Sequence, residues 1–158
     1  MKLAVVALGL AACWTNAPEP MTPVASEPRT PPPAPSRASR WVGTYVCPQG
    51  RTAVTITIEH RCTKTVHGNC AIDGVFEFGP SPDSPRVPHG SYRYEGTVTF
   101  AVTGEILVAA RPLEWIEQPT GYVPVGFVAT SDPDRRAMHG RIVEPQCGEI
   151  ELRRSGPR

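Results

Sequence analysis

The sequence predicts an all-β domain, a small antiparallel barrel or else a sandwich, with about eight short strands braced by disulfides. Apolar and polar residues alternate in short runs, and turn residues separate these runs roughly every 8 to 12 positions. No window of helical length keeps a helical period. Four cysteines remain when Cys13 is set aside, an even number that indicates disulfides in an exported chain.

Residues 1–12 are predicted to be a signal peptide. Lys2 precedes the apolar run Leu3–Leu10, which is too short to span a bilayer. The box Leu10-Ala11-Ala12-Cys13 resembles the bacterial lipoprotein signal, which implies that Cys13 carries diacylglycerol and an amide-linked acyl chain such as palmitate. The alternative is an ordinary secretory signal with an incidental cysteine.

The same resemblance implies a lipid anchor in the cell envelope, so the membrane is an expected partner. Trp14 stands where an aspartate would favour the inner membrane. We therefore expect the outer membrane, at its periplasmic or surface face, in a host with two membranes.

Residues 13–40 are predicted to be a linker that begins with the lipidated cysteine. Eight prolines lie between Pro18 and Pro35, and aliphatic side chains are scarce. Proline fixes φ and removes a backbone donor, so this segment should be an extended spacer.

The β domain is predicted over residues 41–154, followed by a short tail at 155–158. Its clearest strand places Val54, Ile56 and Ile58 on one face and polar residues on the other. A cysteine hairpin is expected to pair 62–66 with 70–78. The predicted strands cover 41–47, 52–59, 62–66, 70–78, 91–102, 105–109, 122–129, 138–143 and 148–153.

Two segments are predicted to be irregular loops, Gly79–Gly90 and Arg111–Gly121. The first contains four prolines, and the second places Trp115 between two prolines. Both are longer than a hairpin requires, so we expect them to carry the function while the sheet faces serve as scaffold.

Aromatic residues near these loops are the candidate binding residues, because they offer a large contact area at a low entropy cost. Trp115 could instead plug the core, between Leu113 and Ile116. Trp41 and Tyr45 are expected in the core. The candidate binding set is Trp115, Tyr122, Tyr92, His89 and Ser91.

The cysteines are expected to pair as Cys62 with Cys70 and Cys47 with Cys147, although other pairings are possible. The second bridge would join the first strand to the last, and this favours a closed barrel. Closing a loop of about a hundred residues is worth about 4 to 5 kcal/mol in the chain-entropy model.

A zinc site is the alternative to the cysteine hairpin, since His60, Cys62, His67 and Cys70 supply four ligands of the right types. An oxidising compartment favours the disulfide, so no metal is predicted.

No catalytic set is predicted. Asp83, Ser84 and His89 lie close together, but a flexible loop cannot preorganise a triad. No phosphate-binding glycine loop or dinucleotide motif is present, so no cofactor is expected. The formal charge is +1 with interspersed signs, which argues against nucleic acid as a partner.

Two resemblances concern the globular part. The framework Trp41-x-Gly43-x-Tyr45-x-Cys47 looks like a small exported bacterial β domain to which no activity is attached. The strand Tyr45-x-Cys47-x-x-Gly50 and the late Cys147 also resemble, distantly, the lipid-anchored inhibitors of C-type lysozyme. That family carries a Ser-Gly-x-x-Tyr loop and a Trp-x-Lys-Gly segment. Here His89-Gly90-Ser91-Tyr92 matches the loop only weakly, and the second segment is missing.

The function expected from the sequence is a non-catalytic binding or interaction module in the cell envelope. Its partner would be an envelope protein or a small ligand. The alternative is an inhibitor of a cell-wall-active enzyme, and an enzyme is the least favoured class.

Overall fold

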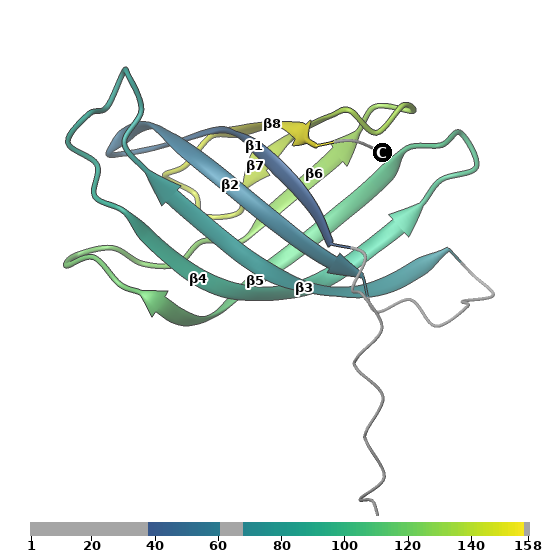
Figure 1. The fold of residues 1–158 in the computed structure, drawn as a ribbon, viewed down its shortest axis with the longest axis horizontal. Helices are drawn as coiled ribbons and strands as arrows, with labels where there is room; N and C mark the ends of the chain where they lie inside the picture. Colours follow the sequence, from purple (N-terminus) through teal and green to yellow (C-terminus); the bar gives the residue numbers. More distant parts are fainter. Residues whose placement is uncertain (1–37, 61–67, 157–158) are drawn as a thin grey trace, which may run out of the picture. The chain divides into compact units, whose positions relative to one another are not determined.

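The fold is a closed barrel of eight antiparallel strands, seen in a computed structural model that describes residues 38–60 and 68–156 (Figure 1). No helix occurs in these two ranges, so none there could cross a membrane. The predicted all-β class is confirmed, and the barrel replaces the sandwich alternative. The strands are β1 (Ala38–Cys47), β2 (Gly50–His60), β3 (Asn69–Gly79), β4 (Gly90–Phe100), β5 (Ile106–Glu117), β6 (Phe127–Ser131), β7 (Ala137–Ile142) and β8 (Glu149–Ser155).

The barrel closes where β1 meets β8, with pairs from Arg40↔Ser155 to Tyr45↔Ile150. Cys47 at the end of β1 forms a disulfide with Cys147 in the turn between β7 and β8, across a sequence separation of 100. The predicted bridge between the first and last strands is therefore confirmed. The compact unit of residues 33–158 contains all eight strands of the described residues.

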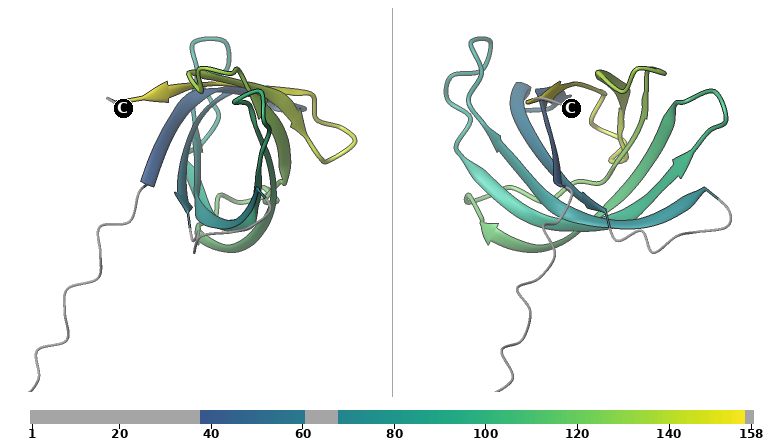
Figure 2. Two further views of the ribbon diagram at one scale, coloured as in Figure 1. Left: turned by 90° about the vertical axis from the view of Figure 1, so that its right-hand side faces the viewer. Right: turned by 45° about the vertical axis from the view of Figure 1, so that its right-hand side comes forward.

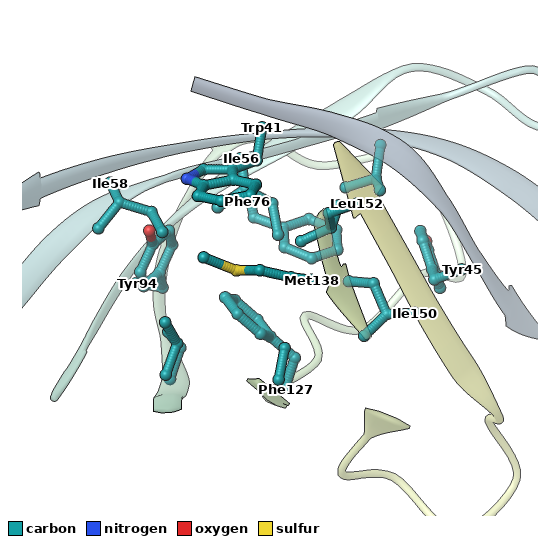
Figure 3. Close-up of a cluster of buried hydrophobic side chains, with 14 of the residues drawn as sticks. Trp41, Tyr45, Ile56, Ile58, Phe76, Tyr94, Phe127, Met138, Ile150 and Leu152 are labelled. Atoms are coloured by element: carbon teal, nitrogen blue, oxygen red, sulfur yellow. The ribbon is translucent and has the colours of Figure 1, made fainter. Parts of the chain in front are cut away.

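The barrel interior is filled by apolar side chains from alternate positions of the strands (Figure 3). Phe76 stacks on Tyr92 with ring centroids 4.9 Å apart and meets Tyr45 edge-on at 5.6 Å. Such interdigitated packing leaves no channel through the middle of a barrel of this strand number. The largest fully buried side chains are Trp41, Tyr92, Tyr94, Phe76, Phe127, Ile56, Ile58, Met138, Ile150, Leu152, Val98 and Val108.

Glycine permits two close approaches inside this wall. A Cβ on Gly43 of β1 would lie 1.8 Å from the backbone oxygen of Glu151 on β8. A Cβ on Gly74 would lie 1.8 Å from the carbonyl oxygen of Thr57, which accepts a hydrogen bond of 3.0 Å from the Tyr94 hydroxyl. Any larger residue would push these strands apart.

The two ends of the barrel differ. The connections 48–49, 80–89, 118–126 and 143–148 lie at one end, on the left in Figure 1, and we call this end the mouth. β1 begins and β8 ends at the opposite end. Figure 2 shows that the 80–89 connection projects beyond the strands.

The predicted loop Arg111–Gly121 is wrong from Arg111 to Glu117, because β5 continues to Glu117 and pairs with β4 as far as Ser91. Two register shifts in this ladder absorb the extra residues. β5 pairs with β6 only as far as Ala110, so Pro112 lies on an edge segment, where proline is tolerated. The predicted strand 122–129 is shorter for a related reason, since pairing begins only at Phe127.

The predicted hairpin between 62–66 and 70–78 is also wrong over most of its length. From Ile72 to Phe78, β3 pairs with β2 along one edge and with β4 along the other, so no edge is left. Residues 61–67, including Cys62 and His67, lie outside the described residues. Cys70 is disulfide-bonded.

Candidate functional site

A cavity of about 460 Å³ opens at the mouth of the barrel. Cavities of this size in barrel mouths, lined mainly by apolar and aromatic groups, are typical small-ligand sites. No charged side chain lines it. Its lining residues are Tyr45, Cys47, Pro48, Gln49, Phe78, Tyr92, Gly121, Tyr122, Val123, Val125, Gln146 and Cys147.

The floor of the cavity is aromatic. Tyr45, Phe78 and Tyr92 are buried, and each is an inward-facing residue near the mouth end of its strand. Alternation along β1, β3 and β4 turns these side chains inward, and the antiparallel order brings the three strand ends together. Because these rings also pack on the core, the floor should be rigid.

Tyr92 ties the floor to the connection between β5 and β6. Its hydroxyl donates to the carbonyl oxygen of Val125 at 2.7 Å and accepts from the Val125 backbone N–H at 3.3 Å. Burial raises the pKa of the Tyr92 phenol, so the hydroxyl remains protonated and able to donate.

Gln49 supplies a polar group at the cavity wall. Its amide nitrogen donates to the Tyr45 hydroxyl at 3.3 Å and to the Thr52 hydroxyl at 3.4 Å. Burial raises the pKa of Tyr45 to about 12, so this phenol is uncharged near neutral pH. The mouth therefore offers a neutral ligand both aromatic surface and hydrogen-bonding groups.

Tyr122 and Trp115 both pack on the floor, but they have different positions. Tyr122 is half-buried, lines the cavity and stacks on Phe78 with ring centroids 5.5 Å apart. Trp115 is also half-buried and meets Tyr92 and Phe78 edge-on at 5.3 Å and 6.3 Å. Trp115 is not among the lining residues, so it braces the floor from outside the cavity.

No protein-family profile and no curated protein matches this chain in sequence. The geometry of the mouth therefore carries the functional argument.

The connection between β3 and β4 borders the mouth and is anchored at its base. Ser81 is buried, and its hydroxyl donates to the carbonyl oxygen of Arg51 at 2.5 Å. The backbones of Ser81 and Ser84 exchange two hydrogen bonds, and Val87 is buried in the core. Asp83 forms an ion pair of 3.6 Å with Arg51. The predicted loop at 79–90 is thus an ordered feature of the mouth.

The predicted binding residues occupy four different positions. Tyr92 and Tyr122 line the cavity, and Trp115 lies behind its floor. His89 lies in a shallow groove on the outer wall near Gly79. Ser91 pairs with Glu117 on β5 and is not a lining residue of the mouth cavity.

Sequence reasoning missed several lining residues, chiefly Tyr45, Gln49, Phe78 and Val125. Tyr45 was expected in the core, and it is buried there while also facing the cavity. The available signal was its inward position beside a predicted turn. That signal becomes specific only when the pairing of the strands is known.

A larger hollow of about 740 Å³ lies on the outer wall over β3, β4 and β5. Small residues form much of its floor, while charged side chains stand around it. Arg111 pairs with Glu95, and Arg93 pairs with Glu114 at 3.4 Å. Because these charges satisfy one another at an exposed surface, the hollow is a weaker candidate than the mouth.

The metal, catalytic and lipidation sites considered from the sequence have the following positions. Among residues 38–60 and 68–156, no three His, Cys, Asp or Glu side chains are grouped so as to hold a metal ion. Asp83 and Ser84 lie together in the connection 80–89, but Asp83 is engaged with Arg51 and His89 lies in the separate groove on the outer wall, so the three residues do not converge on one cavity. Cys13 lies outside the part of the chain that the structure describes.

Proposed function

We propose that this protein is a lipid-anchored envelope protein whose barrel is a non-catalytic binding module, with the mouth cavity as its site. The observation that carries the proposal is the aromatic floor of an uncharged cavity at the mouth of a closed barrel. Burial of an apolar ring or chain there would supply most of the affinity, and the polar groups around Gln49 would orient it.

The topology also bears on access to the site. β1 begins at the end of the barrel opposite the mouth, so the chain enters the barrel away from the cavity.

Binding of the uncharged dye phenylnaphthylamine to residues 33–158 tests the proposal. We expect a fluorescence increase that saturates at one dye per barrel. Tyr122→Ala should weaken binding about tenfold, because it removes a large aromatic contact. Leu107→Ala, a change at an exposed apolar residue on the barrel wall, should leave binding unchanged.

Equal weakening by both variants, or absence of saturable binding, would reject the mouth as the site. If the dye binds as expected, capture of partners from envelope extract by the intact lipidated chain, compared with the Tyr122→Ala chain, identifies what the mouth binds in the cell.

A second candidate function is inhibition of a cell-wall-active enzyme. The observation that favours it is the anchored connection 80–89, which projects from the barrel (Figure 1) and carries the exposed residues Asp83 and Arg86. Rigid polar loops of this kind can enter an enzyme cleft at a low entropy cost. The test is the lysis rate of bacterial cell walls by a C-type lysozyme in the presence of excess barrel. A lysis rate independent of barrel concentration would exclude that enzyme as the target.

A further inference from the structure

The mouth cavity adjoins a second hollow of about 290 Å³ beneath the connection between β3 and β4. Gln49 and Tyr122 line both spaces, so the two meet at these side chains. Their chemistry differs: the first space has no charged lining residue, while the second includes Asp83 and Arg86.

The charge of Arg86 is available to a ligand. Asp83 is engaged by Arg51 at 3.6 Å, whereas Arg86 is exposed and forms no ion pair with any residue of the described ranges. A guanidinium presents several N–H donors in a planar fork, which suits a carboxylate, sulfonate or phosphate group.

The backbone that carries Arg86 is held in place. The Val87 N–H donates to the carbonyl oxygen of Ser84 at 3.3 Å, and the Val87 side chain is buried in the core. Ser81 anchors the start of the same connection through its bond to Arg51. Because the backbone is ordered beforehand, binding needs to immobilise only the Arg86 side chain.

We propose that the mouth binds a small organic anion, with its apolar body on the aromatic floor and its anionic group at Arg86. This inference rests on the proposed function and adds the class of ligand. Gln49 and Tyr122, which face both spaces, lie where the apolar body joins the charged group. A neutral molecule of the same shape uses only the first space and binds less tightly.

Two dyes that differ by one anionic group test the inference with residues 33–158. Anilinonaphthalene sulfonate should bind with a Kd about fivefold lower than its uncharged parent, phenylnaphthylamine, as one partly exposed ion pair would produce. Arg86→Gln should remove this difference while leaving the affinity for the uncharged dye unchanged. Raising the salt concentration should shrink the difference in the wild type.

Arg141→Gln is the matched control, since Arg141 is an exposed arginine on β7 outside both hollows. It should keep the preference for the anionic dye. If the wild type binds both dyes with equal affinity, or if Arg86→Gln still binds the anionic dye more tightly, the inference is overturned while the site for neutral ligands stands. Failure of both dyes to bind overturns this inference and the proposed function together.

Discussion

Trp115 is half-buried, and its contacts decide between its two predicted roles. It meets Tyr92 and Phe78 edge-on, and it packs against the core from β5. These contacts favour the packing role over direct contact with a ligand. Because the Trp115 indole contacts Tyr92 and Phe78, it helps to hold these two rings of the cavity floor in place, so its effect on ligand binding is indirect.

Trp115→Ala should therefore lower the stability of the barrel. We expect the free energy of unfolding to fall by about 2 kcal/mol, less than for a fully buried tryptophan, because the side chain is only half-buried. Urea unfolding of residues 33–158 measures this change. Tyr122→Ala serves as the comparison and should cost less stability but more ligand affinity. Unchanged stability with complete loss of dye binding would instead place Trp115 in direct contact with the ligand.

The buried phenols predict how stability depends on alkaline pH. Burial raises the pKa of Tyr45 to about 12 and also raises the pKa values of Tyr92 and Tyr94 above the ordinary value of 10.0. The folded state thus holds these protons more tightly than the unfolded state. The stabilisation is complete below about pH 10 and is lost as the pH rises through the folded pKa values.

Urea midpoints should consequently stay level between about pH 7 and 9 and fall steeply above about pH 10. Tyrosinate absorbance reports the ionisation of the phenols directly, and for these three it should rise together with unfolding. Tyr45→Phe should make the decline less steep. If the three phenols ionised near pH 10 in the folded protein, the assigned burial would be contradicted.

Among the elements, β5 shows how a partner strand overrides local sequence. Its second half contains Pro112 and follows no clean alternation, which is why the sequence predicts a loop there. Pairing with β4 and two register shifts keep this segment in the sheet and bring Trp115 opposite Tyr92. The partner supplies hydrogen bonds that local preference cannot reveal.

The junction of β1 with the turn between β7 and β8 carries the Cys47–Cys147 bridge. Replacing both cysteines by serine should cost about 4 to 5 kcal/mol in the chain-entropy model, because the closed loop is very long. The matched double replacement of Cys62 and Cys70 should cost less, since the sequence between them is short. Urea unfolding of the two variants gives the order. A larger loss for the Cys62 and Cys70 variant would contradict it.

In the whole molecule, the chain enters the barrel at the end opposite the mouth cavity. Among the described residues, those that line the cavity all lie between Tyr45 and Cys147. The proposed anchor at Cys13 and the proposed binding site therefore depend on different parts of the sequence and can be tested separately.

Acylation of Cys13 is predicted from the Leu10-Ala11-Ala12-Cys13 box. Labelled palmitate should be incorporated into the wild-type chain in bacterial cells and not into the Cys13→Ser chain. Cell fractionation should find the wild type with the outer membrane. Label in both chains would show that the anchor lies elsewhere, and label in neither would favour an ordinary secretory signal.

The sequence alone predicts the all-β class, the inward positions of most strands and the 79–90 loop, because local alternation and proline can be read without knowing the fold. The even number of cysteines predicts disulfides but leaves several pairings open, and the strand order is what brings Cys47 to Cys147. The closed barrel, the partners of β3 and the course of β5 emerge only when the strands are paired. The tertiary structure alone brings Tyr45, Gln49, Phe78 and Tyr122 to one cavity. The physical reason is that strand pairing is non-local: a hydrogen bond between distant residues is not encoded in either segment alone.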